Sequence, residues 1–272
     1  MTSAPAARRR HSDIGKRFAQ AALTYDAVAV LQRGIAESLL TQAHRLLPAP
    51  AAGEHWVDIG CGTGYLTQRL ADQKPACGSL LGIDIALPML KQARTCRTGN
   101  IAWLQADAAQ LPLVSARCDR LYSSLALQWL DDMALFLVQA HRCLRPGGWL
   151  VFTTLGDDTL QEFRTLQETV EHRRPFSLFM SEQQLLRVIE ASPLRLHHHR
   201  RQAFCCHYAN VQHLMRGLSR LGAQGPEHRA QGLRGKRWLK ALDAASASIR
   251  TPQGIPARYD THFLMLQRPA AS

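Results

Sequence analysis

The sequence predicts a single α/β domain built on a seven-stranded, mostly parallel sheet with helices on both faces. Short apolar runs alternate with polar or helix-periodic stretches, which is typical of a parallel sheet whose crossovers are helices. A glycine-rich turn directly follows the first of these runs. The chain has 272 residues, of which 46% are hydrophobic and 20% charged. That is enough to bury a substantial core without disulfide bonds.

The predicted strands follow one another along the chain. Five apolar runs come first, and a long alternating run and a terminal run complete the sheet. In order they are HWVDIG, SLLGID, IAWLQAD, CDRLYSSLAL, GGWLVFTTLG, LRLHHHRRQAFCCHY and RYDTHFLMLQRP. We expect the last two runs to be antiparallel neighbours, which gives the sheet an antiparallel last strand.

The remaining segments are interpreted as parts of one domain over residues 1–272, because no low-complexity linker divides the chain. Around a core at 54–156 they comprise an N-terminal helical arm or lid (11–47), an irregular charged insert (157–180) and a basic helical segment (210–250). On the arm, Ile35 and Leu39 recur at helical spacing. After the insert, Ser181 and Gln184 form a predicted capping box.

The charge of the chain is unusual. Its 33 Lys and Arg exceed its 21 Asp and Glu, which gives a net charge of +12 and favours a polyanion or an acidic protein as partner. The excess is greatest between Arg187 and Lys240, where Glu190 and Glu227 are the only acids. A basic face is expected there, although the alternative of an ordinary solvated surface stays open.

No pattern predicts a membrane span, a secretory signal or a metal centre. The chain has no uninterrupted apolar run of about 18 residues, and its opening MTSAPAARRRHSDIG lacks the apolar stretch of a signal peptide. The seven cysteines are scattered without metal-site spacing. The histidines His197–His199 alternate along a strand and cannot all face one ion. We therefore expect reduced thiols and a cytoplasmic location.

The most specific motif is VDIGCGTGYLTQRL, a strand, a turn and the start of a helix. Gly60, Gly62 and Gly64 let the backbone approach a ligand where a side chain would collide. The G-x-G-x-G spacing differs from the dinucleotide pattern G-x-G-x-x-G and lacks the Gly-Lys-Ser/Thr of a Walker loop. Asp58 lies two residues before the first glycine.

Acidic residues end the next two predicted strands. Asp84 can accept hydrogen bonds from both ribose hydroxyls of a nucleoside, and Asp107 can accept one from the exocyclic amine of an adenine. Apolar walls would come from Ile85, Ala108 and Leu125. A single aspartate at a strand end is more often a helix cap, but together with the glycine turn these residues predict a nucleoside-type site.

From Trp56 to Leu155 this arrangement, including the turn LRPGGWLVF before the fifth strand, resembles the class I S-adenosylmethionine-dependent methyltransferases. The resemblance implies a Rossmann-like fold and S-adenosylmethionine as the cofactor, with 54–156 as the cofactor-binding core. It also implies a role for each motif residue. The amino-acid part of the cofactor would lie by Asp58, Gly60, Gly62 and Gly64, the ribose by Asp84, and the adenine by Asp107 and Ala108.

The identity of the methyl acceptor is constrained by two motifs that the sequence lacks. The fourth strand is followed by SSLALQWL, which lacks the Asn/Asp-Pro-Pro-aromatic signature of amino methylation on bases, and the chain has no Pro-Cys pair. A carboxylate is already ionised at neutral pH and would need no general base.

Segments outside the cofactor core narrow the resemblance. They are RFAQAALTYDAVAVLQRGIAESLL, LALQWLDD, TLQEFRTL, LMRGLSRLGAQ, RGLRGKRWLKALDAA and GIPARYDTHFLMLQRP. Each is similar to its counterpart in the malonyl-acyl-carrier-protein O-methyltransferases of biotin synthesis. The resemblance implies methylation of the free carboxylate of a malonyl thioester, carried by acyl-carrier protein or coenzyme A, to prime pimeloyl synthesis. It makes that carrier the partner of the basic segment and implies no nucleic acid or membrane partner.

Two catalytic roles follow from this resemblance together with the residue chemistry. Tyr25, beside Phe18 on the arm, would dry the cofactor and bond it or the substrate, although a tyrosine packed at a helix edge is an equal alternative. Arg164, on the insert, would grip the malonyl carboxylate, although a solvated charge is the alternative. Gln128 and Trp129 follow the fourth strand, where the acceptor would approach.

Some features depart from the family pattern, and other functions stay open. Asp157 and Asp158 place two acids near the proposed acceptor carboxylate and would repel it. Another small carboxylate or a quinone-type carbon is an alternative acceptor, and a non-catalytic cofactor-binding assembly factor is an alternative function. An RNA methyltransferase is disfavoured, because aromatic residues make up only 7% of the chain and are not interleaved with the basic run.

Overall fold

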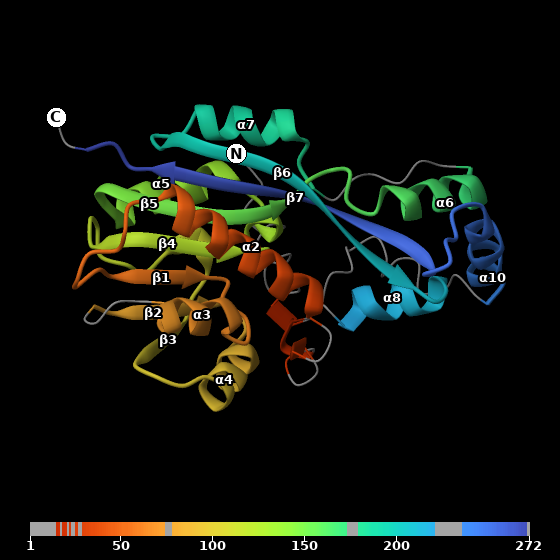
Figure 1. Cartoon of the computed structure of the whole chain (residues 1–272), viewed down its shortest axis with the longest axis horizontal. Helices are drawn as coiled ribbons and strands as arrows, with labels where there is room; N and C mark the ends of the chain where they lie inside the picture. The colour runs from red at the N-terminus through yellow and green to blue at the C-terminus, as the bar shows by residue number, and fades with distance from the viewer. Residues whose placement is uncertain are drawn as a thin grey trace, which may run out of the picture.

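The computed structural model describes residues 15, 16, 18–20, 22, 25, 26, 29–73, 78–172, 179–220 and 236–270. Seven strands form one sheet in the order β3-β2-β1-β4-β5-β7-β6, as Figure 1 shows. The strands are β1 (Trp56–Ile59), β2 (Leu80–Asp84), β3 (Ile101–Gln105), β4 (Cys118–Ser124), β5 (Leu144–Leu155), β6 (Arg195–Tyr208) and β7 (Ile255–Gln267). All neighbours are parallel except β7, which is antiparallel to both β5 and β6. The predicted fold class and the antiparallel last strand are confirmed.

Helices connect the strands. They are α2 (Val30–Leu46), α3 (Tyr65–Gln73), α4 (Leu87–Cys96), α5 (Met133–Cys143), α6 (Gln161–Glu171), α7 (Glu182–Glu190), α8 (Val211–Arg220) and α10 (Lys236–Ala245), with short 3-10 turns η1 (Ala108–Gln110), η2 (Leu127–Trp129) and η3 (Ser246–Ser248). Among the described residues, no helix is long and apolar enough to cross a membrane.

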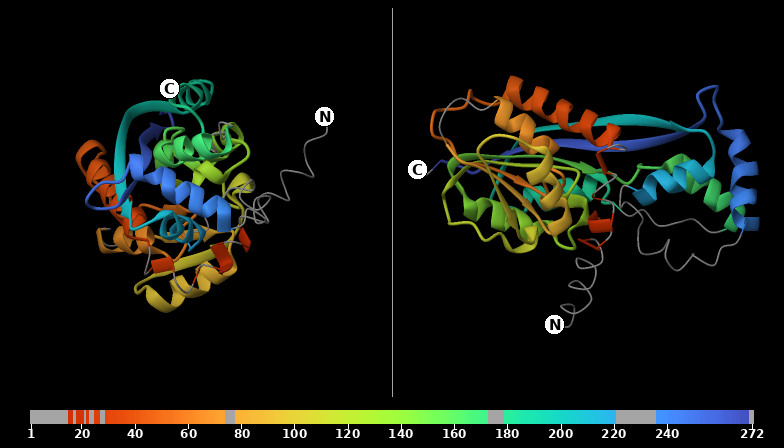
Figure 2. Two further views of the ribbon diagram at one scale, coloured as in Figure 1. Left: turned by 90° about the vertical axis from the view of Figure 1, so that its right-hand side faces the viewer. Right: turned by 90° about the horizontal axis from the view of Figure 1, so that it is seen from below.

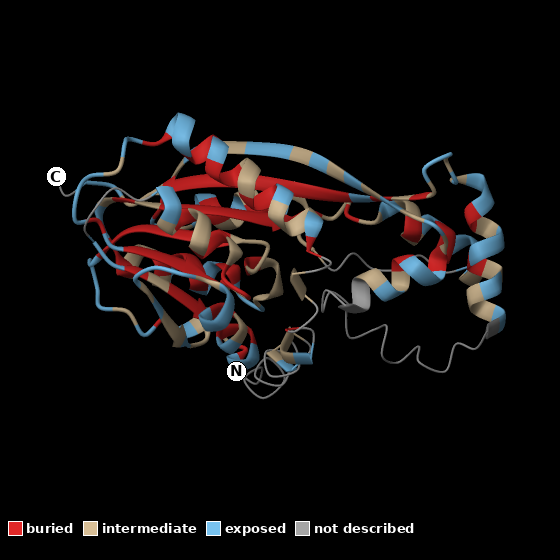
Figure 3. Cartoon of the chain, turned by 60° about the horizontal axis from the view of Figure 1, so that its bottom comes forward, coloured by how far each residue is buried: buried red, intermediate tan, exposed pale blue. Residues whose placement is uncertain are grey.

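Two hydrophobic clusters hold the helices against the two faces of the sheet. On one face, Ile35 and Leu39 of α2 pack with Phe263 of β7, which confirms the predicted apolar face of the arm. On the other face, Phe136 of α5 and Leu185 of α7 belong to a second cluster with the sheet. Figure 3 shows the central strands almost wholly buried between these layers. This buried sheet fixes the positions of the strand ends that form the candidate site.

The long strands β6 and β7 extend beyond the rest of the sheet (Figures 1 and 2). The segment 261–267 of β7 pairs with both β5 and β6, whereas 255–260 pairs with β6 alone. Helices α6, α8 and α10 pack around this extension through a third cluster that includes Leu166, Leu214 and Leu242. We call these three helices and the extended ends of β6 and β7 the distal lobe.

The expectation that 157–180 forms an irregular insert is wrong for its central part, because residues 161–171 form helix α6. Phe163 and Leu166 are three residues apart and both are buried in the distal lobe. This helical spacing was the signal in the sequence, and the surrounding charged residues obscured it. The predicted capping box of Ser181 and Gln184 at the start of α7 is confirmed.

Candidate cofactor and acceptor site

The three glycines of the turn after β1 have positive φ angles, of +70° at Gly60, +54° at Gly62 and +78° at Gly64. A Cβ at Gly60 would lie 2.2 Å from the Cβ of Ala126, and one at Gly64 would lie 2.5 Å from the Trp103 ring. A Cβ at Gly62 would meet nothing within 4 Å. Gly60 and Gly64 are therefore required by packing as well as by backbone conformation, whereas Gly62 faces open space.

Asp84 at the end of β2 holds this turn in place. Its Oδ2 accepts a hydrogen bond from the Gly62 N–H at 2.8 Å, and its Oδ1 accepts one from the Ala86 N–H, also at 2.8 Å. Burial raises the pKa of the Asp84 carboxyl, while these backbone hydrogen bonds oppose the rise. The same carboxyl group thus orders the glycine turn and faces the cavity beside it.

A first cavity lies at the carboxyl ends of β1, β2, β3 and β4. Seven of the predicted cofactor-binding residues line it, namely Gly60, Gly62, Asp84, Ile85, Asp107, Ala108 and Leu125. Asp107 also caps η1, because its Oδ1 accepts from the Ala109 N–H at 2.8 Å. Leu125 has a φ of +53°, which costs a non-glycine residue about 1–2 kcal/mol. The helix-cap reading of Asp107 is confirmed, and its ligand role stays a prediction.

A second cavity adjoins the first and shares Gly60, Gly62, Tyr25 and Ser124 with it. Asp58 lines this second cavity and is 1% exposed. Its Oδ2 accepts from the Thr67 hydroxyl at 2.6 Å, whereas its Oδ1 is buried and has no hydrogen-bond partner within the described part of the chain. Burial, with a contribution from the charge of Asp84, raises the pKa of Asp58 to about 7. An acceptor for a cationic group is thus present and unused.

Gly64 is the one predicted cofactor-binding residue that lines neither of these two cavities. Its contact with Trp103 instead places it at the junction between the turn, β3 and α3. Two residues that the sequence reasoning missed, Gln32 and Arg33 of α2, line the second cavity. Their helix was predicted, but nothing in the sequence pattern indicated which of its polar residues faces inward.

Three aromatic side chains line the first cavity. They are Phe18 and Tyr25 of the N-terminal arm and Trp129 of η2. The Phe18 ring lies 6.4 Å from Tyr25 and 6.1 Å from Trp129, and Trp129 lies 6.0 Å from Phe179, each pair in an edge-to-face arrangement. Burial, and then the charges of Asp84 and Asp26, raise the pKa of the Tyr25 hydroxyl. It therefore stays protonated and can donate a hydrogen bond.

Asp26 fastens the arm to the glycine turn, a contact that the sequence reasoning also missed. Its carboxylate accepts from the Thr63 hydroxyl at 2.5 Å and from the Arg97 guanidinium at 2.7 Å. Arg97 in turn donates to the Thr63 carbonyl at 2.8 Å. The adjacent Tyr25 was the available signal, because a residue beside a lid tyrosine is well placed to anchor it.

The residues proposed for the acceptor side lie in different parts of the fold. Arg164 is on α6 in the distal lobe and donates to the Thr159 carbonyl at 3.0 Å, and it lines neither of the two cavities. Gln128 donates to the Leu125 carbonyl at 2.7 Å, and its Oε1 is buried without a hydrogen-bond partner among the described residues. The catalytic roles of Tyr25 and Arg164 stay predictions.

The three adjacent histidines have three different partners. His197 contacts the Trp149 ring, His198 bonds Gln42 at 3.3 Å, and His199 bonds His262 at 2.9 Å. Within the described part of the chain, no cluster of three or more His, Cys, Asp or Glu is arranged to hold a metal ion. Their contacts are those of packing residues.

Comparison with known proteins identifies the family. A methyltransferase-domain family model matches residues 57–152. Malonyl-acyl-carrier-protein O-methyltransferase from Hahella chejuensis is 33% identical over 260 residues, which cover 94% of this chain and 90% of that protein. The chain belongs to the malonyl-acyl-carrier-protein O-methyltransferase family. The biotin biosynthesis bifunctional protein BioHC from Teredinibacter turnerae is 32% identical to this family member over 98% of the chain but only 48% of its own length. The chain thus spans about half of that relative.

Solved structures agree with this family at the level of the fold. YcgJ from Bacillus subtilis superposes on this chain with a TM-score of 0.60 at 16% identity, over 87% of this chain and 99% of YcgJ. S-adenosylmethionine, the cofactor predicted from the sequence, fits the two adjoining cavities. The first offers two carboxylates and apolar walls to a nucleoside, and the second offers the unpartnered Oδ1 of Asp58 to an ammonium group.

Proposed function

We propose that this chain transfers the methyl group of S-adenosylmethionine to the free carboxylate of a malonyl thioester, and that the ester primes pimeloyl synthesis for biotin in the cytoplasm. The identity to the Hahella chejuensis protein carries this proposal, because it extends over 94% of the chain and so includes the distal lobe outside the cofactor core. The two adjoining cavities support it.

Each site residue would contact a different part of the cofactor. Asp58 would pair with the ammonium group of its amino-acid part, Asp84 would bond the ribose, and Asp107 would bond the adenine. Ile85, Ala108 and Leu125 would pack against the rings, while Gly60 and Gly62 would let the backbone come close. Gly64 would act indirectly by allowing the turn to pack on Trp103.

Methyl transfer from a sulfonium requires alignment of the reactants and exclusion of water more than it requires acid or base catalysis. S-adenosylmethionine supplies a methyl group on a sulfonium that is already activated. A malonyl carboxylate is ionised at neutral pH, so no described residue has to remove a proton. Tyr25 would exclude water and donate a hydrogen bond, and Arg164 would orient the carboxylate.

Arg164→Ala is expected to raise the KM for the malonyl thioester at least about tenfold, because it removes a charged hydrogen-bond partner of the acceptor. The affinity for S-adenosylmethionine should not change, since Arg164 lines neither cavity. Steady-state kinetics and titration calorimetry measure the two effects. Arg187→Ala on the exposed side of α7 is the matched control. Equal KM values for the Arg164 variant and the parent chain would refute the acceptor role.

The distal lobe presents positive charge that suits an acidic carrier protein. Arg216 of α8 and Arg237 and Lys240 of α10 are exposed and form no ion pair within the part of the chain that the structure describes. Asp243, the single acid in the sequences of α8 and α10, is paired with Arg250 at 3.7 Å. The α8 and α10 side of the distal lobe is therefore positively charged, whereas α6, which carries Arg164, also carries the acids Glu162, Glu168 and Glu171.

Reversal of these three charges is expected to raise the KM for malonyl-acyl-carrier protein about tenfold, because steering by opposite charge is lost. The effect should shrink as salt is added, and malonyl-pantetheine, which lacks the protein, should be used as before. A control variant reverses three exposed cations elsewhere, namely Arg45, Lys91 and Arg117. An equal rise in KM for both triple variants would show that only net charge matters.

The proposed reaction is tested by incubating the purified chain with S-adenosylmethionine and either malonyl-acyl-carrier protein or malonyl-coenzyme A. Mass spectrometry should show the gain of one methyl group on the malonyl carboxylate, and the ratio of the two rates identifies the carrier. Cofactor binding without methylation of either thioester would refute the proposal. It would leave another carboxylate, a quinone-type carbon or a non-catalytic assembly role.

A further inference from the structure

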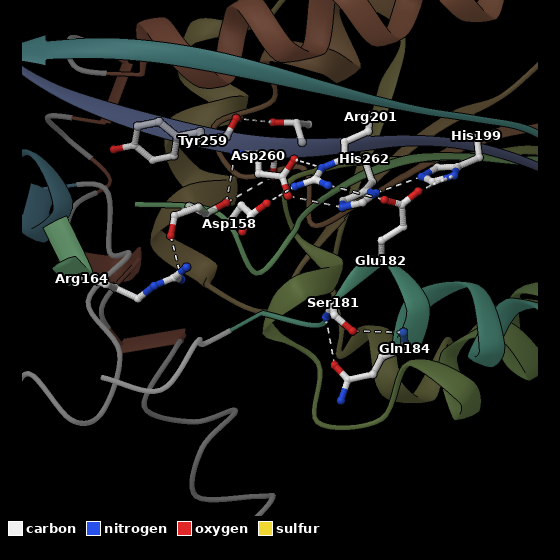
Figure 4. A network of polar contacts seen from close by, with 12 residues as sticks. Asp158, Arg164, Ser181, Glu182, Gln184, His199, Arg201, Tyr259, Asp260 and His262 are labelled. Atoms are coloured by element: carbon white, nitrogen blue, oxygen red, sulfur yellow. Dashed lines mark hydrogen bonds and ion pairs between the residues drawn. The ribbon is translucent and has the colours of Figure 1, made fainter. Parts of the chain in front are cut away.

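A polar network joins β6, β7, the start of α7 and the segment after β5, and Arg201 of β6 is at its centre (Figure 4). The Arg201 Nε donates to Asp260 Oδ1 at 2.7 Å, and its Nη2 bonds Asp158 Oδ2. Its Nη1 lies 3.6 Å from Glu182 Oε2 at the start of α7. One guanidinium thus serves three carboxylates from β7, α7 and the segment after β5.

Two of these carboxylates differ sharply in exposure. The Asp260 side chain is 4% exposed, whereas that of Asp158 is 46% exposed. Although burial opposes it, the His262 ring, whose Nε2 lies 3.6 Å from Asp260 Oδ2, and the Arg201 guanidinium hold the pKa of Asp260 below its usual value. Asp260 is therefore a fixed buried anion that anchors Arg201, and Arg201 in turn reaches outward to Asp158.

Asp158 lies next to the segment that positions Arg164. The neighbouring Thr159 accepts at its Oγ1 from the Asp260 N–H at 3.1 Å, and its carbonyl accepts from Arg164 at 3.0 Å. Leu160, two residues after Asp158, packs in the same cluster as Leu125. Leu125 in turn lines the first cavity. Asp158 is thus adjacent in sequence to the residue that holds Arg164, so under the proposed function its charge would lie near the acceptor carboxylate.

We propose that Arg201 determines acceptor specificity by neutralising Asp158, so that an anionic acceptor can reach Arg164. This inference rests on the proposed function, because only a carboxylate acceptor would meet repulsion from Asp158. The sequence alone indicated two acids that would repel the malonyl group. The structure pairs one of them, Asp158, with a cation that is itself anchored on a buried aspartate. Arg201 acts through Asp158 and is a positioning residue that does not touch the acceptor.

The test compares R201Q, D158N and the double variant R201Q/D158N with the parent chain. R201Q should raise the KM for malonyl-acyl-carrier protein about tenfold, with the dissociation constant of S-adenosylmethionine unchanged. D158N alone should leave the KM within about twofold of the parent value. The double variant should recover the parent KM. Its melting temperature should nevertheless stay below that of the parent, as in R201Q, because Asp260 still lacks its guanidinium partner.

Recovery in the double variant separates charge from folding. A double variant as impaired as R201Q would show that Arg201 is merely structural, and a D158N variant with a raised KM would show that the contact matters and its charge does not. Either result, or an unchanged KM in R201Q, overturns the inference. If R201Q does not fold, R201H replaces it. Its KM relative to the parent should then rise between pH 6 and pH 8 as the imidazole loses its charge, and a flat ratio would overturn the inference.

The proposed function fails in a different way. A parent chain that forms no methyl ester with either malonyl thioester would overturn both proposals together. A parent chain that forms the ester while the variants behave otherwise than expected would overturn the Arg201 inference alone.

Discussion

Replacing Asp84 with alanine is expected to weaken S-adenosylmethionine binding at least about tenfold, or about 1.4 kcal/mol. The carboxylate would accept from the ribose hydroxyls, and it already accepts from the backbone N–H groups of Gly62 and Ala86. Alanine therefore removes ligand contacts and leaves two backbone donors without their partner, and each unsatisfied buried donor costs about 1–3 kcal/mol.

Titration calorimetry measures this loss. Asp84→Asn is informative beside it, because the amide keeps one acceptor oxygen and should bind more tightly than the alanine variant. Asp72→Ala, on the exposed side of α3, is the control for removal of an aspartate. Unchanged affinity in the Asp84→Ala variant would contradict the assignment of this residue to the ribose.

Gly60→Ala and Gly62→Ala are expected to fail for opposite reasons. At Gly60 the new methyl group would lie 2.2 Å from the Cβ of Ala126, so overpacking adds to backbone strain and stability should fall by about 3 kcal/mol or more. At Gly62 the methyl group has open space, so only the strain of about 1–2 kcal/mol applies. Because that methyl group enters the cavity, cofactor affinity should fall while the fold is kept.

Urea unfolding and calorimetry separate the two variants. Gly99→Ala provides a reference, since Gly99 has a φ of +98° and a Cβ there would also meet nothing within 4 Å, but it lines neither cavity. A Gly62→Ala variant that binds the cofactor as well as Gly99→Ala does would show that Gly62 does not face the ligand.

The sequence predicted those parts of the molecule that local pattern determines. The glycine turn and the aspartates at strand ends could be placed because parallel strands bring their carboxyl ends to one edge of the sheet. The helix α6 was missed because its apolar positions, Phe163, Leu166 and Val170, are interspersed with charged residues. Gly64 was predicted to lie by the ligand because a sequence does not distinguish a glycine that packs against Trp103 from a glycine that faces a ligand.

Contacts between distant segments could not be predicted. Asp26 meets Arg97 across 71 residues, and Arg201 meets Asp158 across 43. Such pairs depend on the register of β6 on β7 and on the point at which the arm meets the glycine turn. A single sequence, read without comparison to its relatives, specifies neither of these. Most of the residues predicted to bind the cofactor therefore line the two adjoining cavities, whereas the ion pairs of Arg201 were not predicted.

The distal lobe has a consequence for how this family can diversify. Its cluster, with Leu166, Leu214 and Leu242, shares none of its fully buried members with the clusters that support the sheet. The lobe still meets the first cavity at Leu125, which packs against both the distal-lobe cluster and a sheet cluster. Under the proposed function, substitutions in the lobe away from Leu125 would alter acceptor recognition and leave the shape of that cavity unchanged, so related chains with the same donor site need not share an acceptor.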